Sequence, residues 1–303
     1  MHSSGDLLAD RRYGWALGAC ADGDHVGACD LLEQTLERVP DWAPALVALG
    51  DSRAALQDRA GAIAAWEAGA KADPGGVHGA QLKLAAIGAA PAPIAAPGDY
   101  VRALFDAYSE RFESHLVVAL SYRGPQLLRE ALERVCVRGA RPFAFARMID
   151  LGCGTGLMAA ALKDVAPHAM GVDLSPRMVE AAARTGLYDE LQVGDGAAIL
   201  RKEPAASADL VIAADVFVYM GELADVFEQA ALVLKPRGLF AFSVQKAPVD
   251  WTLGVDLRYS HSQTYLRALA ARTGFEIEAL EEASSRKDNG IDVPGLVCVL
   301  SRA

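Results

Sequence analysis

The sequence predicts an α/β domain preceded by a small all-α domain. Apolar runs typical of buried strands alternate with helical segments through the second half of the chain. The first of these runs ends in a glycine-rich loop that leads into a helix. By contrast, the first ninety residues contain a helical pattern that recurs after 34 residues.

The composition indicates a folded protein of two domains. The chain has 303 residues, of which 52% are hydrophobic, and a formal net charge of −10. This charge argues against nucleic acid as a partner, because phosphate binding requires clustered Lys and Arg. The sequence shows no signal peptide and no uncharged apolar stretch of membrane-spanning length. We therefore expect a cytoplasmic protein that does not bind membranes.

The cysteines give no sign of a metal centre. Five are scattered along the chain without a C-x-x-C pair, a pattern that suits a reducing compartment and predicts no metal ligands. Heavy use of Ala, Gly and Arg favours a bacterial source.

The first domain, expected over residues 1–88, repeats small, large apolar and proline positions. Ala28, Leu32 and Pro40 correspond, after a shift of 34, to Ala62, Trp66 and Pro74. Helices are expected at 9–20, 25–38, 43–55, 59–72 and 77–88. The pattern resembles the tetratricopeptide repeat, in which helices pack at the small positions and proline ends the second helix; a generic array of helical hairpins is the alternative. Because two repeats are few for an independent solenoid, we expect docking of a protein partner or self-association.

Residues 89–99 are expected to form a linker. Pro91, Pro93 and Pro97 exclude regular helix and favour extended, semi-rigid chain. The second domain is therefore predicted to cover residues 100–303.

Five apolar runs in this second domain predict strands at 143–151, 169–173, 191–196, 208–215 and 239–244. Between the first strand and a helix at 157–165 lies the loop Gly152-Cys153-Gly154-Thr155-Gly156. Such a loop places backbone N–H groups around a polar ligand, and glycines leave room for that ligand to approach.

Acidic residues end the next two strands. Asp173 comes 21 residues after Gly152 and can accept hydrogen bonds from both hydroxyls of a ribose. Asp195 ends the third strand beside Gly196. Since ligands bind at the carboxyl edge of parallel sheets, these acids and the glycine loop are expected to form one site.

The ordered runs MIDLGCGTGLMAAAL, GVDLSPRMVEAAA, VGDG, ADLVIAADVF and LKPRGLFAFSV closely resemble class I S-adenosylmethionine-dependent methyltransferases. The resemblance implies a Rossmann-like, seven-stranded mixed sheet with helices on both faces, and S-adenosylmethionine as the cofactor. It implies that Asp150, Gly152, Gly154 and Gly156 hold the amino-acid end of the cofactor, Asp173 the ribose, and Met178 and Asp195 the adenine. Ala214, Asp215 and Val216 would form the floor of the site, and Cys153, Leu174 and Gly196 are expected to line it.

A nicotinamide-dependent dehydrogenase is the alternative interpretation of the loop. Those enzymes use a similar strand, loop and helix but require the pattern G-x-G-x-x-G. Here the third glycine comes one position early. The loop therefore favours the methyltransferase.

Two further stretches are candidates for the acceptor side. Phe105, Tyr108 and Phe112 fall on one face of a helix, which either packs on the sheet or forms a lid over the methyl donor. Tyr219 follows the fourth strand, and Arg258 and His261 lie in a polar, aromatic segment before the last helix. His261 is the best candidate for a general base because histidine titrates near neutrality, and Tyr219 and Arg258 are candidates for orienting the acceptor.

Together, the repeats and the runs FDAYSERFESHL and RYSHSQTYL resemble a bacterial family of predicted methyltransferases with N-terminal tetratricopeptide repeats. The run DVFV differs from the motif for methylation of adenine or glutamine nitrogen. We therefore expect transfer to an oxygen, nitrogen or carbon atom of a small molecule. The alternatives are a protein acceptor delivered by the repeats, or an inactive scaffold.

Overall fold

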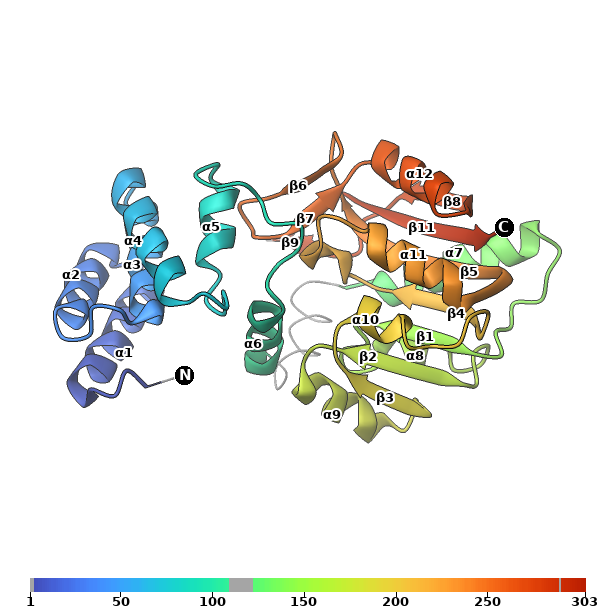
Figure 1. Ribbon diagram of the computed structural model, residues 1–303, viewed down its shortest axis with the longest axis horizontal. Coiled ribbons are helices and arrows are strands. Elements are labelled where there is room, and N and C mark those ends of the chain that lie inside the picture. The colour runs from blue at the N-terminus through green and yellow to red at the C-terminus, as the bar shows by residue number, and fades with distance from the viewer. Residues whose placement is uncertain (1–2, 109–121, 289) are drawn as a thin grey trace. The chain divides into compact units, whose positions relative to one another are not determined.

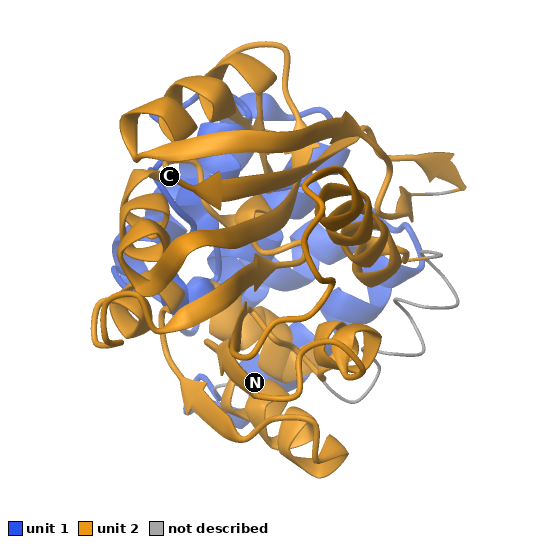
Figure 2. Cartoon of the chain, turned by 90° about the vertical axis from the view of Figure 1, so that its right-hand side faces the viewer, with its two compact units in different colours: residues 1–100, 255–257 blue, residues 101–254, 258–303 orange. Residues whose placement is uncertain are grey.

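The computed structural model describes residues 3–108, 122–288 and 290–303. The chain forms two compact units, which Figure 2 distinguishes by colour. Unit 1 comprises residues 1–100 with 255–257, and unit 2 comprises residues 101–254 with 258–303. The helices of unit 1 and the sheet of unit 2 have separate apolar cores.

Unit 1 is helical. Its helices within the described residues are α1 (Leu7–Ala21), α2 (His25–Leu36), α3 (Ala43–Ala55), α4 (Arg59–Ala72) and α5 (Ala80–Ala86), each packed on the next (Figure 1). Asp6, Asp24 and Asp58 accept N–H groups at the starts of α1, α2 and α4. A Cβ on Gly50 would lie 2.3 Å from the Trp66 ring, so α3 and α4 approach closely at a small residue.

Unit 2 is built on one mixed sheet of order β3-β2-β1-β4-β5-β11-β8 (Figure 1). The strands are β1 (Met148–Leu151), β2 (Ala169–Asp173), β3 (Glu190–Val193), β4 (Ala208–Ala213), β5 (Leu234–Lys246), β8 (Phe275–Glu282) and β11 (Gly295–Arg302). The first five are parallel, whereas β11 runs antiparallel to both β5 and β8. This is the Rossmann-like mixed sheet that the sequence predicts.

The sheet has two more strands than the seven expected. The short strands β6 (Trp251–Leu253) and β7 (Tyr259–His261) form an antiparallel pair, and β7 adds to the end of β5. A separate two-stranded ribbon consists of β9 (Lys287–Asp288) and β10 (Ile291–Asp292).

Helices cover both faces of the sheet. Alternate residues of β4 and β5 point to opposite sides, so that each strand contributes to two apolar layers. One layer contains α7 (Gly124–Arg138) and α8 (Leu157–Leu162). The other contains α10 (Gly196–Leu200), α11 (Ala224–Val233) and α12 (Gln263–Arg272). Helix α9 (Pro176–Thr185) packs on β2 and β3, and helix α6 (Gly98–Tyr108) is hydrogen-bonded to the chain after β2.

Some strand boundaries differ from those predicted. β1 begins at Met148 rather than 143, because the Phe145 N–H donates to Val165 O instead of pairing with a strand. β4 ends at Ala213, and Asp215 takes a positive φ of 60°. β5 extends beyond the predicted 239–244 at both ends, because Leu234 pairs with β4 and Lys246 pairs with β7.

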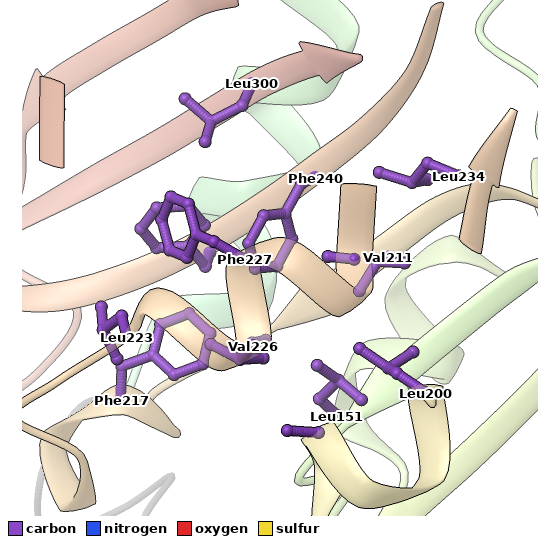
Figure 3. Packing of buried hydrophobic residues seen from close by; sticks show 14 of the residues in the cluster. Leu151, Leu200, Val211, Phe217, Leu223, Val226, Phe227, Leu234, Phe240 and Leu300 are labelled. Atoms are coloured by element: carbon purple, nitrogen blue, oxygen red, sulfur yellow. The ribbon is translucent and has the colours of Figure 1, made fainter. Parts of the chain in front are cut away.

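A group of phenylalanines fills the layer under α11 (Figure 3). Phe227 lies 5.1 Å from Phe240 and 5.3 Å from Phe242, centroid to centroid, in edge-to-face geometry. Phe217, from the 3-10 helix η3 (Phe217–Tyr219), lies 5.3 Å from Phe242. Edge-to-face aromatic pairs add to the free energy of area burial. They tie the chain after β4 to the core.

Replacing Phe227 with Ala is expected to lower the free energy of unfolding by about 3–5 kcal/mol, since the ring is fully buried and would leave a cavity. Chemical denaturation followed by circular dichroism measures this loss. Leu232→Ala on the same helix is the control, because Leu232 is 55% exposed and its truncation should cost less than about 0.5 kcal/mol. Equal losses in the two variants would contradict the aromatic core described here.

Candidate active site

The glycine loop after β1 adopts a backbone that other residues avoid. Gly152, Gly154 and Gly156 have φ values of +63°, +53° and +98°. A Cβ on Gly152 would lie only 2.5 Å from a methyl group of Val216, which follows β4. The Cys153 N–H donates to Val172 O at 2.9 Å and so joins the loop to β2. The loop is therefore held close to the ends of both neighbouring strands.

Asp173, at the end of β2, is bonded directly to this loop. One carboxylate oxygen accepts the Gly154 N–H at 2.9 Å, and the other accepts the Ser175 N–H at 2.9 Å. Burial raises the pKa of Asp173, and the two N–H groups oppose that rise. An acid at the predicted strand end thus fixes the shape of the predicted loop.

Asp150 lies beneath the same loop and is almost completely buried. The Tyr188 hydroxyl donates to its carboxylate at 2.6 Å. Burial raises the pKa of Asp150 to about 7, although the Tyr188 hydrogen bond lowers it. The Tyr188 ring also lies 3.3 Å from the position of a Cβ on Gly156. Tyr188 was not predicted, because it lies 38 residues from Asp150 in the connection between α9 and β3, where nothing in the sequence marks a site.

The other predicted cofactor residues follow the ends of β1, β2, β3 and β4. Met178 is fully buried near the start of α9, where its N–H donates to Ser175 Oγ at 3.1 Å. Asp195 accepts the Ala198 N–H at 2.8 Å and begins α10. Cys153 is buried, and burial raises the pKa of its thiol well above the ordinary range. Their contacts with a cofactor stay predictions.

Helix α6 is bonded to the chain that follows β2. Asp106 accepts the Ser175 hydroxyl at 2.5 Å, and Arg102 Nε donates to Leu174 O at 3.4 Å. The helix predicted as a lid therefore lies next to the predicted cofactor residue Leu174. Phe112, on the same predicted helix face, lies outside the described residues.

Three of the four predicted catalytic residues lie near one another. The Phe105 and Tyr219 rings meet edge to face with centroids 5.5 Å apart, and the Arg258 guanidinium lies 5.7 Å from the Tyr219 centroid. Burial raises the pKa of Tyr108, while the nearby charge of Arg258 lowers it. We call Phe105, Tyr108, Tyr219 and Arg258 the aromatic cluster. Their roles in catalysis stay predictions.

His261 has a different environment. Its side chain is fully buried on β7, where Nε2 lies 3.0 Å from Gly221 O and the ring stacks on Tyr265. Burial lowers the pKa of His261 to about 4, so the ring is neutral near pH 7. These contacts are those of a residue that holds the chain after η3. The predicted role of His261 as a base stays untested.

Asp215 is surrounded by polar groups from distant parts of the chain. Its N–H donates to Ser243 Oγ on β5 at 2.9 Å, and its carboxylate accepts the Ser285 hydroxyl at 3.1 Å. The Arg286 guanidinium lies 3.8 Å from the other carboxylate oxygen, and its side chain is only 8% exposed. Ser285 and Arg286 were not predicted, because nothing near them in sequence marks a site.

No group of three metal-ligating side chains lies together in residues 3–108, 122–288 and 290–303. Within the same ranges, no helix has the length and apolar composition needed to cross a membrane.

Comparison with known proteins agrees with this geometry. Residues 149–242 match the family model described as a methyltransferase domain. The chain contains a class I S-adenosylmethionine-dependent methyltransferase domain. Two solved methyltransferase structures share its fold: one from a Haloferax volcanii complex with the activator Trm112, and magnesium protoporphyrin IX methyltransferase of Synechocystis. The first has a TM-score of 0.52 at 20% identity and covers 66% of this chain and 96% of its own. The second has a TM-score of 0.51 at 16% identity and covers 68% of this chain and 99% of its own.

Among curated proteins, the methyltransferase domain is similar to ubiquinone biosynthesis O-methyltransferases. The protein of Xanthomonas oryzae pv. oryzae is 29% identical over 139 residues, which are 44% of this chain and 58% of that protein. The protein of Xylella fastidiosa is also 29% identical over 139 residues, which are 44% of this chain and 56% of that protein. The chain thus spans less than two thirds of the length of these relatives.

Asp150→Asn is expected to remove a pH dependence of stability from the cofactor-free protein. The folded protein retains the Asp150 proton up to about pH 7, whereas the unfolded chain releases it near pH 4. Native Asp150 therefore contributes stability at low pH that is lost as pH rises from 4 through 7, by at most about 4 kcal/mol. Urea denaturation measures the free energy of unfolding of both proteins. The difference between wild type and variant should be smaller at pH 8 than at pH 5.

Glu180→Gln is the control, since Glu180 is an exposed carboxylate of the same domain. Its difference from wild type should not change between the two pH values. If the difference in free energy of unfolding between Asp150→Asn and wild type is also the same at both pH values, the burial of the Asp150 carboxyl group is contradicted. The pKa of Asp173 is also raised, so Asp173 changes the pH dependence of stability in the same direction in wild type and in both variants.

Proposed function

We propose that the protein transfers the methyl group of S-adenosylmethionine to a hydroxyl oxygen of a small-molecule acceptor. The observation that carries the proposal is the glycine loop of unit 2, bonded through Gly154 to Asp173 at the carboxyl edge of the sheet. The names of the curated relatives, O-methyltransferases, favour oxygen over nitrogen or carbon. The aromatic cluster at Tyr219 favours a small, planar acceptor over a flexible peptide.

The residues present fit S-adenosylmethionine. Gly152 leaves space that a Cβ would fill, and the carboxyl groups of buried Asp150 and half-buried Asp173 suit a ligand with a cationic end and two ribose hydroxyls. We propose that Asp150 and the loop glycines hold the amino-acid end and that Asp173 holds the ribose. When bound, the sulfonium supplies an activated methyl group, so the protein's task is mainly to align the acceptor and exclude water.

Calorimetry and a turnover assay test the proposal. The full chain should bind S-adenosylmethionine, and formation of S-adenosylhomocysteine should depend on a hydroxyl acceptor such as catechol. Aniline, an amine of similar shape, is the control for the atom methylated. A folded chain that does not bind the methyl donor would contradict the enzymatic function and favour a scaffold.

Asp173→Asn is expected to weaken S-adenosylmethionine binding by about 100-fold, because an amide replaces a charged acceptor of two hydrogen bonds. Titration calorimetry measures this change. Glu180→Gln removes a nearby exposed charge on α9 and should leave the dissociation constant within about twofold. If both variants bind like wild type, Asp173 does not contact the ribose.

For residues 1–88 we propose tetratricopeptide-like repeats that mediate self-association or partner docking, with 89–99 as a linker. The exposed apolar side chains of Leu7, Trp15 and Val26 on α1 and α2 support an interaction surface. Light scattering of the full chain should give a dimer mass that Trp15→Asp reduces to that of a monomer. A monomeric wild type would leave partner docking, including delivery of a protein acceptor, as the alternative.

A further inference from the structure

Asp215 adopts a backbone conformation that marks it among the residues at the carboxyl edge. Its φ of +60° lies in the left-handed region, where Asp is tolerated but still uncommon. The hydrogen bond from its N–H to Ser243 Oγ holds the peptide there. Strained positions of this kind are concentrated at functional sites, because surrounding contacts must maintain them.

The carboxylate of Asp215 also has a partner at each oxygen. The Ser285 hydroxyl donates to one oxygen, and the Arg286 guanidinium lies beside the other. Ser285 is itself fixed, since its carbonyl accepts the Arg123 N–H at 2.7 Å. The Asp215 side chain is nevertheless 16% exposed to solvent, so a ligand atom can reach it. A carboxylate can accept about four hydrogen bonds, which leaves capacity for one from a ligand.

Asp215 also lies next to the glycine loop. β1 and β4 are neighbours in register, with Leu151 opposite Ala213. Val216, the residue after Asp215, packs on Gly152. Tyr122 lies within the electrostatic reach of both Asp215 and Asp150, whose charges raise its pKa further above the value set by burial. The buried carboxyl group under the loop and the reachable carboxylate of Asp215 thus belong to one site.

We propose that Asp215 orients the acceptor hydroxyl and takes its proton, and that Ser285 and Arg286 are positioning residues for Asp215. The inference rests on the proposed methyl transfer. In the step, the acceptor oxygen forms a bond to the methyl carbon as the sulfur–carbon bond breaks and its electron pair stays on sulfur. The hydroxyl proton passes to the Asp215 carboxylate. This role replaces that of His261, which is fully buried.

Asp215→Asn is the direct test, because Asn also tolerates the left-handed conformation and has nearly the same shape, but it lacks the charge and one acceptor oxygen and cannot take a proton. With catechol as the acceptor probe, we expect kcat to fall at least 100-fold. The S-adenosylmethionine dissociation constant should stay within about threefold of wild type. Unchanged kcat would overturn the inference. Loss of cofactor binding would also overturn it, by placing Asp215 in the cofactor site. Absence of methyl-donor binding by wild type would instead contradict the proposed function.

Acceptor acidity separates proton transfer from a structural defect. 4-Nitrocatechol ionises more readily than catechol and depends less on a base. The ratio of the wild-type kcat to the Asp215→Asn kcat should therefore be at least tenfold smaller with 4-nitrocatechol than with catechol. An equal ratio for the two acceptors would show that Asp215 does not accept the proton.

Variants of Arg286 test the positioning role. Arg286→Gln should lower kcat at least tenfold with little change in cofactor affinity, and Arg286→Lys should recover part of the loss because it restores the charge. Lys287→Gln is the control, since it removes an exposed positive charge at the next residue. Equal kcat in Arg286→Gln and Lys287→Gln would overturn the assignment of Arg286.

Discussion

The close approach of two chain segments, Gly152 after β1 and Val216 after β4, determines the geometry of the whole carboxyl edge. A side chain on Gly152 would collide with Val216, so only glycine allows the segments to meet. Once they meet, the loop must turn back toward β2, where Asp173 accepts the Gly154 N–H. The strand ends, the loop and the segment that carries Asp215 are thereby joined in one surface. A Cβ at a single position would separate them.

This surface is electrostatically unfavourable when it holds no ligand. Asp150 is fully buried and Asp173 is half-buried, and each has a raised pKa because loss of solvent penalises its charged form. A ligand with positive charge and hydroxyl groups offsets that penalty. Removing these two carboxyl groups from solvent therefore destabilises the folded protein, which an apolar core at the same place would not do. Perturbed carboxyl groups at a strand edge indicate a site, whereas Asp195 does not by itself, since it also begins a helix.

The sequence predicted the features whose cause is local. The glycine loop, the acid at the end of β2 and the parallel strands each follow from a few consecutive residues. Tyr188, Ser285 and Arg286 could not be predicted, because they reach Asp150 or Asp215 only through the folded sheet and their residue types are common at surfaces. The burial of His261 was missed for a related reason: the short strand that contains it pairs with β5, and no periodicity reveals a strand of three residues.

The segment from Asp215 to Gly221 shows how distant contacts fix an acceptor site. Ser243 holds the peptide of Asp215, the phenylalanine core holds Phe217, and His261 holds the carbonyl of Gly221. Asp215 and Tyr219 lie on either side of the Phe217 anchor, so their separation cannot change without disturbing the core. The partners come from β5, β7 and the chain after β8, beyond the loop and strand ends assigned to the cofactor. Substitutions in these later segments can therefore alter the acceptor while leaving methyl-donor binding intact.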